Sequence, residues 1–187
     1  MEAFEQFVAL AMETEGLVVS GALKFPVRRQ TRKAGYAEFQ THGFEVDLIG
    51  ANRERLVLAT VKSFFGSRGV VAEQVSGESP THSGWYALLN NPDVRGAVTR
   101  SAAERFGYDV NQLEIRLYVG RFAGGHEQRV RAWCDSQLVG GSPIRVVGAH
   151  EVVDIVRKVA TSTTYRDNPV LATLKVLTAT GSLVTGK

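Results

Sequence analysis

Residues 43–50 (GFEVDLIG) and residues 56–62 (LVLATVK) are two apolar segments separated by the polar residues 51–55 (ANRER). Val, Ile and Leu dominate both segments, which is typical of β-strands, and a short polar stretch between two strands favours a hairpin loop. The sequence therefore predicts an antiparallel hairpin, with its turn centred on Arg53 and Glu54.

Four polar side chains lie on this predicted hairpin. Side chains alternate between the two faces of a strand, so Glu45 and Asp47 share a face, as do Thr60 and Lys62. With the turn at this place, Asp47 lies opposite Thr60 and Glu45 opposite Lys62. Two carboxylates and an ammonium group would then meet, which suits a divalent metal ion and a phosphodiester. The alternatives are polar rim residues of an ordinary hairpin and a structural ion pair.

The other segments predict strands that first meander and then alternate with helices. Periodicity and capping residues predict helices over residues 2–15, 92–106, 127–138 and 150–160 and from 169 onward, and strands over 17–27, 113–119 and 144–147. Pro26 is expected to stop the first strand, and Leu138 to lie on the buried face of its helix. This order favours a single α/β domain with a mixed sheet and helices on both faces.

Composition excludes several classes of protein. The single cysteine, Cys134, rules out an internal disulfide, and the four histidines lack metal-ligand spacing. Residues 63–69 (SFFGSRG) lack the Gly-Lys-Ser/Thr of a P-loop, so no nucleotide cofactor is expected. No apolar run reaches the ~18 residues of a membrane span, and acids stand where a secretory signal has lysines. A cytoplasmic location without a membrane partner is the expectation.

A basic segment precedes the hairpin. Residues 24–33 contain no acid and five basic residues: Lys24, Arg28, Arg29, Arg32 and Lys33. The last four are candidate contacts to nucleic-acid phosphates, and Tyr36 and Phe39 nearby could stack on bases of a single strand. A solvated basic loop is the alternative, and the net charge of +3 does not decide between them.

The order helix, three strands, helix, strand resembles that of the PD-(D/E)xK nuclease superfamily, which has the restriction-endonuclease-like fold. The opening helix is similar to that of Mrr-type endonucleases and Holliday-junction resolvases, with Glu5 eleven residues before Gly16. Residues 45–49 (EVDLI) resemble the E-(I/V)-D-L-I strand of bacterial relatives, and residues 58–63 (LATVKS) resemble the next strand, (E/D/Q)-x-K. Beyond residue 65 the resemblance rests on the order of elements alone.

The resemblance implies a three-layer nuclease-like core over residues 1–148 and a C-terminal helical extension over 149–187 packed on the same domain. It also implies metal-dependent hydrolysis of DNA phosphodiesters with Mg²⁺ or Mn²⁺, in a bacterial cytoplasm or as a phage protein acting there. Many nucleases of this fold work as dimers, so a homodimer is a further expectation.

Site residues carry over position by position. Asp47 corresponds to the invariant metal ligand, Glu45 would supply a second carboxylate, and the main-chain carbonyl of Val61 would be a third ligand. Lys62 would orient or deprotonate the attacking water, and Glu5 would hold a water or a second metal.

Thr60 departs from the motif, because the family has an acid or a glutamine at this position. Two alternatives to a nuclease therefore stay open. One is a degenerate member of the fold that binds nucleic acid without cutting it, and the other is an interaction protein whose C-terminal helices dock a protein partner.

Overall fold

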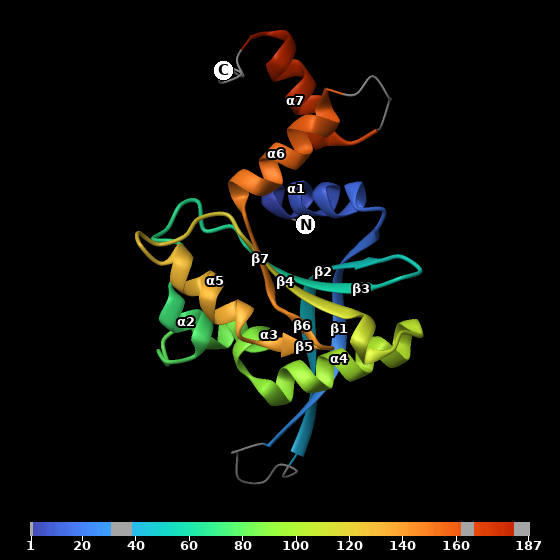
Figure 1. Cartoon of the computed structure of the whole chain (residues 1–187), viewed down its shortest axis with the longest axis vertical. Helices are drawn as coiled ribbons and strands as arrows, with labels where there is room; N and C mark the ends of the chain where they lie inside the picture. Colours follow the sequence, from blue (N-terminus) through green and yellow to red (C-terminus); the bar gives the residue numbers. More distant parts are fainter. Residues whose placement is uncertain (1, 31–38, 162–166, 182–187) are drawn as a thin grey trace.

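The computed structural model describes residues 2–30, 39–161 and 167–181. A mixed sheet in the order β1-β2-β3-β4-β7 organises this part of the chain (Figure 1). Its strands are β1 (Val18–Gln30), β2 (Phe39–Ala51), β3 (Leu56–Lys62), β4 (Leu113–Val119) and β7 (Arg145–Gly148). The first three strands are antiparallel neighbours, whereas β4 is parallel to β3 and β7 is parallel to β4. The expected α/β class with a mixed sheet is confirmed.

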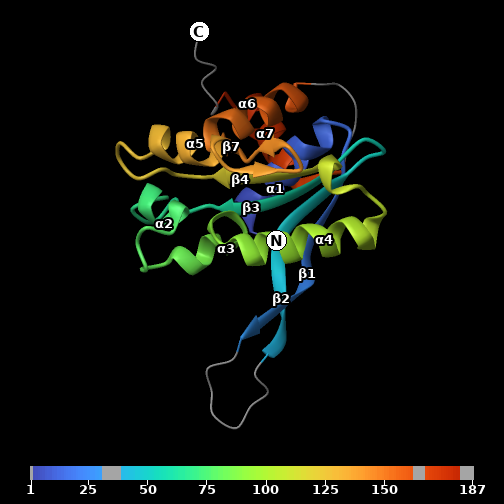
Figure 2. The same cartoon turned by 60° about the horizontal axis from the view of Figure 1, so that its bottom comes forward.

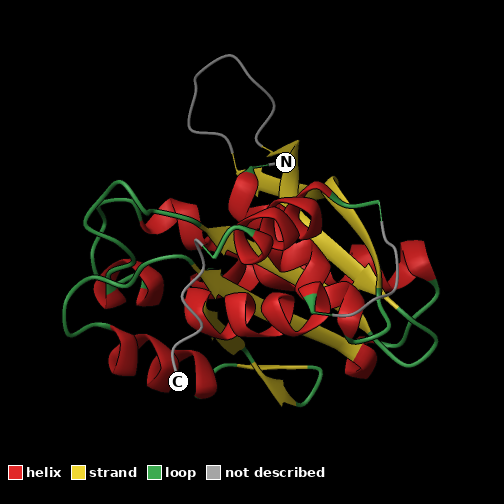
Figure 3. Cartoon of the chain, turned by 90° about the horizontal axis from the view of Figure 1, so that it is seen from above, coloured by secondary structure: helices red, strands yellow, loops and turns green. Residues whose placement is uncertain are grey.

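Helices cover both faces of the sheet, so the molecule has three layers (Figures 2 and 3). The helices are α1 (Ala3–Thr14), α2 (Ala72–Ser76), α3 (Ala87–Asn90), α4 (Pro92–Phe106), α5 (Glu127–Asp135), α6 (Ala149–Ala160) and α7 (Pro169–Ala179), with 3₁₀ turns η1 (Ser83–Tyr86) and η2 (Val110–Gln112). One hydrophobic cluster, here the α4 core, joins the sheet to α2–α5 and includes Phe25, Val46, Leu58, Val94, Val98 and Ile115. The other, the α1 core, joins the sheet to α1, α6 and α7 and includes Phe4, Val8, Leu48, Ala59, Tyr118 and Val152.

The turn between β2 and β3 has the predicted register. The Asn52 side-chain oxygen accepts hydrogen bonds from the backbone N–H groups of Glu54 (2.9 Å) and Arg55 (3.1 Å), an Asx-type turn that a short polar side chain favours. The strand pairs run from Ala51 opposite Leu56 to positions 48 and 59. The turn is thus centred on Arg53 and Glu54, as the sequence predicts.

The first strand is longer than predicted. Pro26 lies within β1, opposite Gly43, and β1 continues to Gln30. A proline is tolerated here because β1 is an edge strand, so its missing N–H removes no bond to a further strand. The prediction that Pro26 ends the strand is wrong. The β1–β2 ribbon consequently projects beyond the helices (Figure 1).

The helix predicted over residues 127–138 ends at Asp135 instead. Leu138 lies in the two-residue strand β5 (Leu138–Val139), paired with β6 (Ser142–Pro143), and its side chain is 64% exposed. Gly140 and Gly141 both have positive φ, at +57° and +85°, which a tight two-residue hairpin requires. Leu138 thus belongs to the hairpin closed by the Gly-Gly pair and not to the helix, and the prediction that Leu138 is buried is wrong.

The two Asn-Pro signals predict helix starts correctly. The Asn91 side chain accepts hydrogen bonds from the N–H groups of Asp93 and Val94 at the start of α4. Asn168 does the same for Val170 and Leu171 at the start of α7. Within the described residues, no helix combines the length and the apolar character that crossing a membrane requires.

An ion network around the buried Arg116 ties α1 to the sheet at the turn end of the hairpin. Arg116 on β4 is fully buried, and its guanidinium donates to both carboxylate oxygens of Glu15, at 2.8 and 3.0 Å. Glu114 and the Tyr118 hydroxyl complete its surroundings. Arg55 from the hairpin also donates to Glu15, at 2.9 Å. The network keeps every charge paired where an unpaired one would be costly.

Replacing Glu15 with Gln is expected to lower the free energy of unfolding by about 3 kcal/mol at pH 7, because the buried Arg116 charge loses its bidentate partner. Urea unfolding measures this, with Glu104→Gln on the exposed face of α4 as a matched control that changes stability by less than about 0.5 kcal/mol. Equal effects of the two substitutions would show that the network contributes nothing.

The pH dependence has a defined sign. Burial raises the pKa of Glu15, but the hydrogen bond and charge of Arg116, with the charges of Arg145 and Arg55, lower it more, so the pKa lies below its usual value. A lowered folded-state pKa stabilises the protein above the unfolded-state pKa of about 4.3. The difference between the wild type and Glu15→Gln should therefore be full near neutral pH and shrink as the pH falls below about 4.

Candidate active site

The side chains of β2 exchange faces at Asp47. Val46 belongs to the α4 core and Leu48 to the α1 core, although residues two apart share one face of a regular strand. Asp47 thus sits where the strand twists from one face to the other, and its side chain is not confined to either core.

β1 exchanges faces at the same level. Val19 packs with the α1 core and Leu23 with the α4 core, although residues four apart share one face of a regular strand. Ala22 lies between these two, and the pairs on either side of it place it opposite Asp47. Its φ of +54° is one that non-glycine residues rarely adopt. The ribbon therefore twists about the pair formed by Ala22 and Asp47, next to Gly21.

The Asp47 carboxylate turns toward β3. Its Oδ2 atom accepts the backbone N–H of Val61 at 2.6 Å and the Thr60 hydroxyl at 3.1 Å. The Lys62 ammonium lies 3.8 Å from the same oxygen. The side chains of Asp47 and Lys62 are 24% and 18% exposed, so the pair is mostly enclosed and still reached by solvent. The predicted meeting of Asp47, Thr60 and Lys62 is confirmed.

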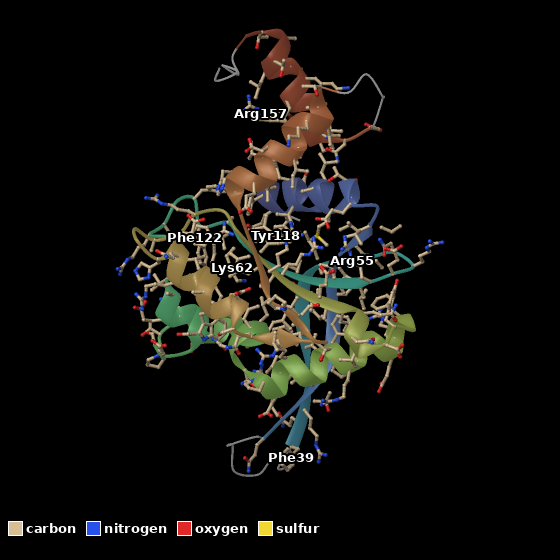
Figure 4. The ribbon with its side chains drawn as sticks, in the orientation of Figure 1. Phe39, Arg55, Lys62, Tyr118, Phe122 and Arg157 are labelled. Atoms are coloured by element: carbon tan, nitrogen blue, oxygen red, sulfur yellow. The ribbon has the colours of Figure 1, made fainter. Side chains whose placement is uncertain are left out.

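Lys62 ends β3, and the chain beyond it is held against β4. The N–H of Gly120 donates to the Lys62 carbonyl at 2.8 Å. A Cβ atom at Gly120 would lie only 2.0 Å from the carbonyl oxygen of Ser63, so only glycine allows this approach. In Figure 4 Lys62 lies at one end of β3 and Arg55 at the other, so the candidate site and the ion network around Arg116 occupy opposite ends of the strand.

Glu45 does not join this group. It lies beyond the twist, opposite Lys24 of β1, and the two side chains form an ion pair at 3.6 Å. The Glu45 side chain is 50% exposed. Of the two carboxylates expected beside Lys62, only that of Asp47 lies there, because the exchange of faces along β2 separates Glu45 from Lys62.

Glu5 occupies a capping position. Its carboxylate accepts the backbone N–H of Glu2 at 2.9 Å, closing a capping box at the start of α1. The acid on this helix that contacts the end of β3 is Glu2, which accepts a hydrogen bond from the Ser63 hydroxyl at 3.1 Å. No contact joins Glu5 to Asp47 within the described residues.

Arg28 and Arg29 lie far out on the β1–β2 ribbon, while Arg32 and Lys33 fall outside the described residues. Arg28 pairs with position 41, six residues from Asp47, and at about 3.3 Å per residue this is about 20 Å along the strand. Its guanidinium stacks on the Phe39 ring at 4.5 Å, and Phe39 lies at the end of the ribbon (Figure 4). The basic segment is thus remote from the site.

A groove of about 860 Å³ connects the ribbon to α4. Arg28, Arg29 and Phe39 line one wall, and the start of α4 with Asp93 and Arg100 lines the other. Three guanidinium groups against one carboxylate give the groove a positive charge. Sequence reasoning missed Arg100, because nothing in its local pattern indicates that α4 packs beside the ribbon.

The residues at Asp47 offer few metal ligands. The described part of the chain contains no group of three or more His, Cys, Asp and Glu residues placed to hold a metal. Asp47 Oδ2 already accepts hydrogen bonds from Thr60 and Val61, whereas Oδ1 accepts no hydrogen bond from the described residues. Mg²⁺ commonly takes only one or two carboxylates and keeps several waters, so Asp47 Oδ1 and the Val61 carbonyl are of the right chemical type for two ligands of such an ion.

Comparisons of the chain with protein-family models, with curated proteins and with solved structures found no match.

Removing the Asp47 carboxylate should destabilise the fold even without any ligand. Asp47→Ala leaves the buried Val61 N–H without an acceptor, and the expected loss is about 1–3 kcal/mol of unfolding free energy. Asp47→Asn keeps a carbonyl oxygen and should lose less. Chemical denaturation tests this, with Glu45→Ala as the control, since an exposed ion pair contributes little. A loss no larger for Asp47→Ala than for Glu45→Ala would contradict the described role.

Proposed function

We propose that the protein hydrolyses phosphodiester bonds of DNA with the help of Mg²⁺ or Mn²⁺, on a restriction-endonuclease-like fold. One observation carries the proposal: Asp47 and Lys62 meet on neighbouring strands with 3.8 Å between carboxylate and ammonium, at a twist where the second carboxylate oxygen accepts no hydrogen bond from the described residues. The chain order of helix, three antiparallel strands, helix and parallel strand supports the same fold.

The chemistry follows from the two charges. The cation supplies, when bound, a more acidic water and positive charge beside the phosphate. Asp47 Oδ1 and the carbonyl of Val61 would hold it. Lys62, anchored through its own carbonyl, would contact a phosphate oxygen or orient the attacking water. Because Oδ2 remains bonded to the Val61 N–H, the free carboxylate oxygen has a fixed direction.

The groove between the ribbon and α4 supports a polynucleotide substrate. Arg28 lies about 20 Å along the ribbon from Asp47, which is about six phosphates along one strand at 3.4 Å each, and Arg29 and Arg100 line the same groove. Contacts so far from the site would position a long strand rather than a small phosphate ester. A salt-dependent contribution of this groove to binding is the consequence.

A second candidate function is binding of nucleic acid without cutting. The observation that favours it is the hydroxyl of Thr60, which donates to Asp47 where the resemblance expects a second acid or a glutamine. A carboxylate satisfied by Thr60, Val61 and Lys62 is stable without a cation. The two candidates share the groove and differ in whether Asp47 binds a metal.

Purified protein should nick or cut DNA when Mg²⁺ or Mn²⁺ is present, and chelation should stop it. Asp47→Asn and Lys62→Ala should each lower the cleavage rate at least about 100-fold, since each removes a group that acts on the reacting phosphate. Gel assays with single-stranded, duplex and branched DNA measure this.

Asp154→Asn and Lys158→Ala on α6 are matched controls, because they remove the same charges away from the site. If cleavage persists in both site variants, it comes from a contaminant or from another site. Absence of cleavage together with salt-sensitive binding would select the second candidate.

Thr60→Asp should convert the position into a second carboxylate. Two acids side by side repel each other, so this variant should unfold at a lower temperature than the wild type without metal. Mn²⁺ should reverse the loss, by about 2.7 kcal/mol at a concentration about 100 times its Kd. Thermal unfolding with and without Mn²⁺ measures it, and Thr60→Asp combined with Asp47→Asn should lose the response. A response that survives in the double variant would place the metal elsewhere.

A further inference from the structure

A second cavity opens directly after the end of β3. It has a volume of about 650 Å³, within the range of small-molecule sites, and lies between the segment that follows Lys62 and the 3₁₀ turn η1. Its lining includes Phe64, Arg68, Gln74, Thr81, His82 and Trp85. None of these residues takes part in the site at Asp47.

Three aromatic rings gather in this cavity. The His82 and Trp85 rings are stacked, with centroids 4.1 Å apart and planes inclined by 24°. The Phe64 ring also packs against Trp85, with the two ring centroids 5.9 Å apart. Trp85 nevertheless leaves 53% of its surface exposed. An indole held by neighbouring rings and still open to solvent is a ready stacking surface for another flat ring.

Two of these rings belong to residues with strained backbone conformations. Among the described residues, only Ala22, Phe64 and His82 are non-glycine residues with positive φ. Phe64 has φ +46° and His82 has φ +63°, and both flank Trp85. Such conformations cost free energy and cluster at functional sites. Ala22 lies at the Asp47 twist, so all three strained residues belong either to the candidate active site or to this cavity.

The charges in the cavity suit a nucleotide. Arg68 forms no ion pair within the described part of the chain, whereas the one acid of the lining, Glu73, is paired with Arg129 at 2.7 Å. Phe64 is two residues from Lys62, so the cavity begins within about 7 Å of the Lys62 backbone. A nucleotide next to the phosphate at Lys62 would therefore reach it.

We propose that this cavity binds the base of an unpaired nucleotide next to the phosphodiester at Lys62, with Trp85 as the stacking surface and Arg68 as a phosphate contact. The proposal rests on the proposed function and narrows its substrate to DNA with a single-stranded or unpaired segment. A base inside a duplex keeps both faces stacked on its neighbours and cannot stack on Trp85, whereas an unpaired base can.

Affinity for two DNA probes tests this, with EDTA present so that neither is cut. The probes are a fluorescein-labelled single strand of about 12 nucleotides and a blunt duplex of the same length. Trp85→Leu should weaken single-strand binding about ten-fold and leave duplex binding unchanged. The matched control is Phe106→Leu, another partly exposed aromatic ring on α4 outside the cavity, which should change neither.

The His82→Gly variant distinguishes an effect on stacking at Trp85 from an effect on folding. Glycine adopts φ +63° without strain, so this variant should keep or raise the unfolding temperature, while single-strand affinity falls because the indole loses its neighbouring ring. The intrinsic fluorescence of Trp85, read in a Trp133→Phe background that leaves it as the single tryptophan, should be quenched by the single strand and not by the duplex.

Unchanged single-strand affinity in Trp85→Leu, or an equal loss for both probes, would overturn the proposal. Cleavage that depends on Asp47 and Lys62 together with either result would refute the cavity and keep the nuclease. Single-strand binding that depends on Trp85 without any cleavage would refute the nuclease and keep the cavity. Failure to bind either probe would overturn both.

Discussion

The hydrogen bond from the Val61 N–H to the Asp47 carboxylate is the constraint on which the candidate site depends. The paired positions of β2 and β3 run only as far as Leu48 and Ala59, because β2 twists away where its side chains exchange faces. The N–H of Val61 on the buried strand β3 still needs an acceptor, and Asp47 supplies it through its side chain. Because its Oδ2 atom accepts the Val61 N–H, the Asp47 carboxylate is held beside Lys62.

The two ends of the sheet divide structural and chemical roles. At the turn end, the buried Arg116 is paired with Glu15, which also binds Arg55, and these contacts fix where the end of α1 meets the hairpin. At the other end, the Asp47–Lys62 pair is no more exposed than Glu15 and Arg55, and it lies beside strained backbone at Ala22. The two ends differ in pairing: every charge around Arg116 has a partner, whereas Asp47 Oδ1 accepts no hydrogen bond from the described residues and is available to a ligand.

Local patterns in the sequence predicted the hairpin register, the mixed sheet and the helices that begin at Asn-Pro, because each depends on residues close together in the chain. Features that depend on tertiary contacts could not be predicted in this way. Pro26 continues a strand because β1 is at the edge, which its own segment cannot reveal. Glu45 does not lie beside Lys62, because β1 and β2 twist together between it and Leu48. The aromatic cavity joins Phe64 to Trp85, which are separated by the least regular part of the sequence.

A metal site at Asp47 can be tested through the effect of Mn²⁺ on the amide signals of the ¹⁵N-labelled protein. Mn²⁺ broadens the resonances of nearby nuclei, and the Val61 amide is bonded to the proposed ligand. We expect substoichiometric Mn²⁺ to broaden the signals of Val61 and Lys62 first, and Asp47→Asn to remove this effect. Broadening confined to other residues, or identical broadening in Asp47→Asn, would contradict a metal site at Asp47.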